Sequence, residues 1–172
     1  GPPLPQEATA HLNMARCHFY RGDLSACEKH LEQALERCQM FNLPGVRAEI
    51  FEAYGNLHRE RGETVRAAAS YEQAARAYEE AGIELVRREM LEEQSLLRLQ
   101  MGDVIGARAL IDRLIEARIA NEDEMGLHTA TLARSRILLA ERQQNLASSE
   151  LEPALYYFRE HGLNYYEAQA AL

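Results

Sequence analysis

The sequence has almost no lysine and no long hydrophobic run. Lys29 is the only lysine among 19 basic residues, and 27 acidic residues give a formal net charge of −8. This balance argues against binding to nucleic acids, whose phosphates are neutralised by lysine and arginine. No apolar run approaches the roughly 20 residues that a transmembrane helix needs. We therefore expect no direct nucleic-acid partner and no membrane partner.

Cysteine is also scarce. Cys17, Cys27 and Cys38 are odd in number, form no C-x-x-C motif and have no histidine at a ligand spacing. Free thiols in a reducing cytosol fit this pattern better than a disulfide framework. No basic segment followed by an apolar core, the pattern of a secretory signal, is visible. We therefore expect a cytoplasmic location.

No set of residues indicates catalysis. The histidines are scattered, and His18 and His58 stand at equivalent positions of an internal repeat, which favours packing over metal binding. The glycines are single, so no Gly-rich loop is present to hold a phosphate. The tyrosine-rich stretch at 154–168 contains only Arg159 as a cation, which argues against a surface for stacked bases. We expect no enzyme, no metal and no cofactor.

The sequence does contain an internal repeat, with a period of about 40 residues that lies in the range of helical solenoids. A glycine followed by an acid returns at Gly22, Gly62 and Gly102, and Arg142 stands at the fourth equivalent position. Small residues and then large residues follow at matching offsets: Cys27, Ala67, Ala107 and Ala147, then Leu31, Tyr71, Ile111 and Leu151. Spacings of three and four place such residues on one helical face. Each repeat is therefore predicted to be a helix A, a tight turn and a helix B.

Local signals predict where the helices begin and end. Asn42, Gly82 and Gly162 fall at equivalent places and suit the left-handed conformation that ends a helix. Ser25 with Glu28 predicts a capping box for the first helix B.

Pro153 falls where the fourth helix B should already be running, so we expect this helix to kink or to start late, near Glu152. We expect repeats at 7–45, 46–83, 84–123 and 124–163, followed by the start of a fifth helix A at 164–172. Residues 1–6 are expected to be a disordered lead left by an affinity tag. We expect one solenoid domain, 7–172, cut from a longer protein.

These features resemble the tetratricopeptide repeat (TPR). The second repeat carries the motif most fully, at Tyr54, Gly55, Gly62, Ala67, Tyr71 and Ala74. The resemblance extends over roughly 7–172 and departs from the motif at Cys27, Ser95, Leu114 and the missing fourth turn glycine. It implies an all-α, right-handed superhelix of antiparallel helix pairs. The period exceeds the family's usual value of about 34 and is similar to that of bacterial signalling proteins, including MalT-like transcription activators.

In TPR proteins the A helices line a concave groove that holds a peptide or partner helix. By resemblance, the groove residues are Leu12, Arg16, Phe19, Glu49, Glu52, Asn56, Arg59, Glu89, Glu92, Glu93, Leu96, Leu99, Leu132, Arg136 and Leu139. The five glutamates favour a basic or amphipathic partner. A solvated helix face, with Glu89 and Glu93 near Arg87 and Arg88, explains them equally well. The family's clamp for C-terminal chaperone carboxylates is expected to be absent, because no groove position is lysine.

The resemblance implies a module that binds a protein or peptide and belongs to a bacterial signalling or transcription-regulating protein. Two alternatives remain open. The end repeats could pair two copies of the chain as a homodimeric scaffold, or the superhelix could hold a small ligand and act as a sensor.

Overall fold

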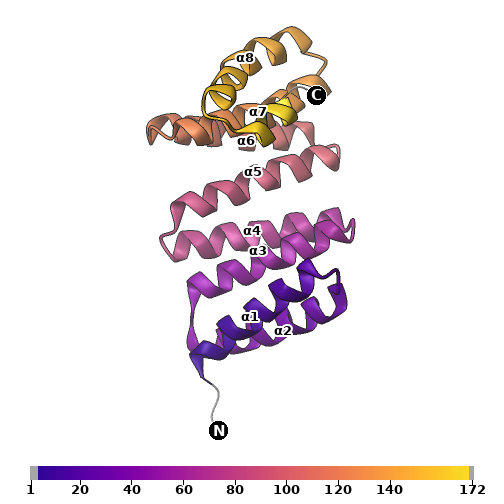
Figure 1. Cartoon of the computed structure of the whole chain (residues 1–172), viewed down its shortest axis with the longest axis vertical. Helices are drawn as coiled ribbons and strands as arrows, with labels where there is room; N and C mark the ends of the chain where they lie inside the picture. The colour runs from indigo at the N-terminus through magenta and orange to yellow at the C-terminus, as the bar shows by residue number, and fades with distance from the viewer. Residues whose placement is uncertain (1–3, 171–172) are drawn as a thin grey trace. The chain divides into compact units, whose positions relative to one another are not determined.

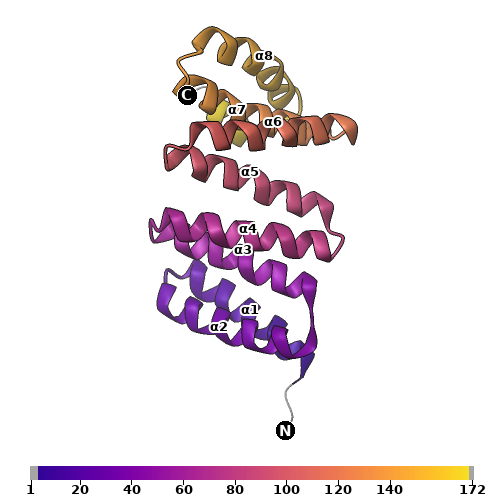
Figure 2. The same ribbon diagram turned by 180° about the vertical axis from the view of Figure 1, so that it is seen from behind.

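The computed structural model describes residues 4–170, and all regular structure in that range is helical. The helices are α1 (Pro5–Tyr20), α2 (Leu24–Phe41), α3 (Pro44–Glu60), α4 (Thr64–Glu80), α5 (Glu84–Gln100), α6 (Val104–Ala120), α7 (Glu124–Ala140), α8 (Gln144–Glu160) and α9 (Asn164–Ala170). Consecutive helices form antiparallel pairs (Figures 1 and 2). The predicted all-α fold of about four helix pairs and one further helix is thus confirmed.

The expected ends of the domain are described only in part. Helix α1 begins at Pro5, before the expected start of the first repeat, so the last residues of the expected lead are helical. Residues 1–3 and 171–172 lie outside the described residues. None of the helices within 4–170 combines the length and the apolar character needed to cross a membrane.

A short turn with a left-handed residue follows each of the helices α1 to α8, so that every repeat contains two such turns. In the first turn, Gly22 has a φ of 78°. The Asp23 N–H donates to the carbonyl of His18 at 3.0 Å, and the Gly22 N–H donates to that of Phe19 at 2.9 Å. These two bonds make a Schellman motif, which satisfies carbonyls that the helix end leaves open.

The residue types at these turns differ. The predicted left-handed residues Asn42, Gly82 and Gly162 are confirmed, with φ of 48°, 72° and 65°. Glu122 and Arg142 adopt the same conformation, with φ of 53° and 61°, although neither is glycine. The turn is therefore imposed by the helices on either side of it as well as by the residue within it.

An aspartate after a turn glycine caps the next helix, whereas Glu63 after Gly62 makes no side-chain cap. The Asp23 carboxylate accepts a hydrogen bond from the Ala26 N–H at 3.0 Å. The predicted capping box is wrong, because Ser25 already lies inside α2 and Glu28 pairs with Arg61 instead. The acid is thus placed to satisfy one of the open N–H groups of the new helix.

The proline in α8 does not shorten the helix. Helix α8 begins at Gln144 and runs through Pro153, so the expected late start near Glu152 is wrong. The proline removes one backbone bond to the carbonyl of Ser149. Both residues are exposed, which allows water to satisfy that carbonyl. The buried Phe158 beyond the proline anchors the second half of the helix.

The chain divides into two compact units, Gly1–Leu97 and Arg98–Leu172, called here the N-terminal and C-terminal units. The core of the N-terminal unit follows the predicted pattern of small and large residues. Tyr71 is 1% exposed, and a Cβ placed on Gly55 would lie only 2.5 Å from its ring. The small residue therefore lets α3 and α4 approach each other.

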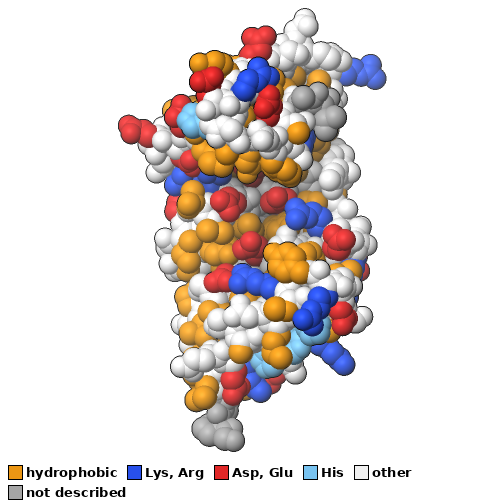
Figure 3. Space-filling view, viewed as in Figure 1, with side chains coloured by type: hydrophobic (Ala, Val, Ile, Leu, Met, Phe, Trp, Pro, Cys, Tyr) orange, Lys and Arg blue, Asp and Glu red, His pale blue; other side chains and the backbone are white. Residues whose placement is uncertain are grey.

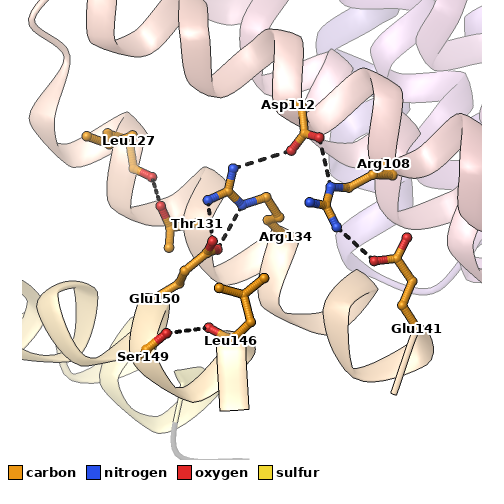
Figure 4. Close-up of polar contacts among 9 residues, drawn as sticks. All are labelled: Arg108, Asp112, Leu127, Thr131, Arg134, Glu141, Leu146, Ser149 and Glu150. Atoms are coloured by element: carbon orange, nitrogen blue, oxygen red, sulfur yellow. Dashed lines mark hydrogen bonds and ion pairs between the residues drawn. The ribbon is translucent and has the colours of Figure 1, made fainter. Parts of the chain in front are cut away.

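Polar contacts tie the helices of the C-terminal unit together (Figure 4). Arg134 of α7 lies between two acids: its Nε donates to Glu150 of α8 at 2.8 Å, and its Nη1 donates to Asp112 of α6 at 3.3 Å. Asp112 also accepts from Arg108, whose Nη1 reaches Glu141 at 2.7 Å. This chain of charges fixes α6, α7 and α8 against one another.

Candidate binding surface

The predicted groove residues of the N-terminal unit come from three A helices, α1, α3 and the part of α5 up to Leu97. Helices α1 and α3 pack against each other. Arg16 Nη2 donates to Glu49 Oε2 at 2.8 Å and links α1 to α3. Arg59 Nη1 donates to Glu93 Oε2 at 2.8 Å and links α3 to α5. The spacing therefore brings these four predicted residues together as two ion pairs.

Leu12 does not belong to this accessible surface. Its side chain is 1% exposed and packs in the core with Ala8 and Ala15. These residues share one face of α1, and packing against α2 covers that face. Phe19, Glu92 and Leu96 are half-buried, and Glu89 is exposed.

Two tyrosines of α4 hold polar groups of α3. The Tyr78 hydroxyl donates to Glu52 Oε2, and the Tyr71 hydroxyl donates to Asn56 Oδ1 at 2.7 Å. Burial raises the pKa of both phenols, so they remain protonated donors at neutral pH. Sequence reasoning placed Tyr71 in the packing between helices and missed both hydroxyl contacts, because residue spacing does not reveal where a phenol ends.

A pocket of about 300 Å³ opens between α1, α2 and α3. Its lining includes four predicted groove residues, Arg16, Phe19, Glu52 and Asn56, and four that were not predicted, Ala15, Tyr20, Cys27 and Ala53. The volume lies at the lower end of the range for ligand sites. It therefore suits one side chain or a small molecule.

The surface is less acidic than its glutamates suggest. Arg16 and Arg59 neutralise Glu49 and Glu93, whereas the partner of Glu52 is an uncharged phenol. The counter-ion of Glu93 is Arg59 of α3 and not an arginine of α5. On the face shown in Figure 3, acidic, basic and hydrophobic side chains are interspersed over the N-terminal unit.

Comparison with protein families identifies this part of the chain. Residues 6–80, which include nearly all of α1 to α4, match the family described as tetratricopeptide repeat. Residues 6–80 are therefore similar to tetratricopeptide repeats. TPR modules are generally protein–protein interaction domains and are typically non-catalytic. A search of curated proteins gives no match.

Arg136 belongs to the C-terminal unit. It stands at the position in its repeat that Arg16 holds in the first TPR, and its Nη2 donates to Gln169 of α9. The contact thus joins two successive A helices, as Arg16 and Glu49 do in the N-terminal unit. In the same unit Leu132 is 7% exposed and Leu139 is 45% exposed.

The histidines of the first two TPRs have partners at the turns. His18 Nδ1 lies 3.5 Å from Asp23 Oδ2, and the equivalent His58 Nδ1 lies 2.7 Å from Glu63 Oε2. His30 stacks on both His11 and His18. Within residues 4–170, no three His, Cys, Asp or Glu side chains are grouped so that they could hold a metal ion.

Proposed function

We propose that the N-terminal unit binds a basic or amphipathic segment of a protein partner across α1, α3 and α5. The observation that carries this proposal is the position of Glu52. Glu52 lines the pocket between α1, α2 and α3, and its hydrogen-bond partner, Tyr78, is uncharged. A positively charged segment would supply Glu52 with a counter-ion, which Tyr78 of α4 cannot provide.

The ion pairs on this surface support a site that is already shaped. Arg16 with Glu49 and Arg59 with Glu93 link neighbouring A helices. A surface fixed in this way orders few side chains when a partner docks, which lowers the entropy cost of binding.

We further propose that the chain is the interaction segment of a bacterial signalling or transcription-regulating protein. The support is the length of the repeat. Helices α3 and α4 have 17 residues each, and with their turns they make a unit similar in length to the long repeats of MalT-like regulators. In such a protein the TPR segment would hold the partner while an attached domain carries the output.

Selection from a random peptide library tests the binding proposal. We expect the enriched peptides to carry net positive charge and to be lost by the variant Glu52→Arg, Glu89→Arg, Glu92→Arg. The control Glu36→Arg, Glu72→Arg, Glu79→Arg makes the same charge change on the B helices α2 and α4. Circular dichroism first confirms that both variants are folded.

The control separates a specific surface from a general charge effect. Equal loss of peptides from both variants would mean that only the overall charge matters. Retention by the A-helix variant would contradict the proposed surface. It would favour self-association instead, which sedimentation of the parent chain would then show.

A further inference from the structure

The pocket between α1, α2 and α3 exists because its floor is made of small side chains. Ala15 and Cys27 are 0% and 2% exposed, and Ala53 lies beside them in the lining. The larger residues Arg16 and Phe19 stand at the edge of this floor. The pocket is therefore closed by the small side chains at its floor and is open toward solvent.

The pocket carries one carboxylate whose charge is not balanced. Glu52 Oε2 accepts from Tyr78, and no other residue within 4–170 donates to Glu52 Oε1. The cation of the pocket, Arg16, is already paired with Glu49 at 2.8 Å. These three charged groups therefore leave a net charge of −1 beside the pocket. A carboxylate with one oxygen fixed and one open is positioned to accept a further charged hydrogen bond.

Two aromatic rings stand beside this carboxylate. Phe19 and Tyr20 both line the pocket, with ring centroids 5.9 Å apart and planes at 78°. Tyr20 is 85% exposed, although its ring is large and apolar. Ring faces attract cations, and a guanidinium stacks on them better than an ammonium does.

We propose that this pocket takes one arginine side chain of the partner segment. Glu52 accepts from the guanidinium, and the rings of Phe19 and Tyr20 flank it. This inference rests on the proposed function and names the partner chemistry at one point of the surface. A neutral side chain would leave the charge of Glu52 unbalanced, and an acidic one would have to displace Glu49 from Arg16.

Titration followed by NMR tests the pocket without a known partner. The probe is Nα-acetyl-arginine methylamide, and its uncharged analogue carries citrulline. We expect saturable shifts at the lining residues with the arginine probe and about tenfold weaker binding of citrulline, the loss that one charged hydrogen bond produces. Glu52→Gln should weaken the arginine probe by a similar factor. Glu60→Gln, an exposed acid on the same helix, should leave it unchanged.

Each contrary outcome overturns the pocket assignment. Absence of saturable shifts, equal binding of arginine and citrulline, or full binding by Glu52→Gln would do so. Tighter binding of Nα-acetyl-glutamate methylamide would assign the pocket to an acidic side chain through Arg16. If library peptides are lost by a Glu89→Arg, Glu92→Arg variant that keeps Glu52 while the arginine probe fails, the broader surface stands and only the pocket assignment is refuted.

Discussion

Glu28 and Arg61 form an ion pair between α2 and the end of α3 that Arg108 and Glu141 repeat with the charges exchanged. Arg61 Nη2 lies 2.8 Å from Glu28 Oε2, and Arg108 Nη1 lies 2.7 Å from Glu141 Oε2. Each residue of the second pair lies two whole repeats after its counterpart in the first. The contact between a helix B and the following helix A therefore accommodates an ion pair of either polarity.

This exchange predicts a rescue. Glu28→Arg or Arg61→Glu alone should lower the free energy of unfolding by about 1 kcal/mol, because each places like charges in contact. The double variant Glu28→Arg, Arg61→Glu should recover most of that loss. Urea unfolding of the four proteins completes the cycle. Additive losses in the double variant would show that the two sites do not tolerate the exchange.

Replacing Arg142, the left-handed residue between α7 and α8, by glycine should raise the stability of the protein. Arg142 has a φ of 61°, which costs a residue with a Cβ about 1 kcal/mol. We expect Arg142→Gly to stabilise by about 0.5 kcal/mol after the added entropy of the unfolded chain is subtracted. The reverse change at the equivalent turn, Gly102→Arg, should destabilise. Thermal unfolding measures both, and a loss of stability in Arg142→Gly would contradict the argument.

Gly55 is needed for space and not for backbone freedom. A Cβ there would lie 2.5 Å from the buried ring of Tyr71, and we expect Gly55→Ala to destabilise by about 1–3 kcal/mol. Gly45 of the same helix is the matched control, since its added Cβ would meet only Ile83 at 3.9 Å. Gly45→Ala should leave stability unchanged or raise it by up to about 1 kcal/mol. Equal effects in chemical denaturation would refute the close approach of α3 and α4.

Acid should destabilise the C-terminal unit through His128. Its ring lies 4.3 Å from that of Tyr157, and burial lowers its pKa below the ordinary 6.5. The folded state thus binds the proton less readily than the unfolded state. The stability that the neutral His128 ring contributes is fully present above pH 6.5 and is lost as the pH falls through the lowered pKa of the folded state. His128→Gln should show a smaller drop in melting temperature between pH 7.5 and pH 5 than the parent. An unchanged drop would exclude His128 as the cause.

Residue types predicted the fold where they suit an uncommon backbone conformation. Gly22 and Asn42 tolerate a positive φ, so their recurrence gave the turns and the period. Arg142 and Glu122 adopt the same conformation without any such signal, because the flanking helices impose it. Pro153 was misleading for the opposite reason, since burial of Phe158 outweighs one missing backbone bond.

The candidate site was predictable only at the level of helices. The spacing placed Arg16 and Glu49 on neighbouring A helices, but an amphipathic pattern alone could not show that Leu12 faces α2. The contact between Tyr78 and Glu52 depends on the length of a phenol reaching from another helix. The pocket depends on the volume that small side chains leave unfilled between packed helices. That volume cannot be read from the sequence of one helix.

The turns that recur twice in each repeat have a further consequence for insertions and deletions. The backbone does not distinguish an A helix from a B helix, so the distinction lies in the side chains alone. Excising one whole repeat between equivalent glycines would keep every later helix in its role. Excising half a repeat would preserve the turns but would place each later A helix at a B position and each later B helix at an A position. Residues that pack in the core would then lie at the surface. Gene rearrangement within this chain is therefore expected to keep the roles of later helices in whole repeats and to exchange them in halves.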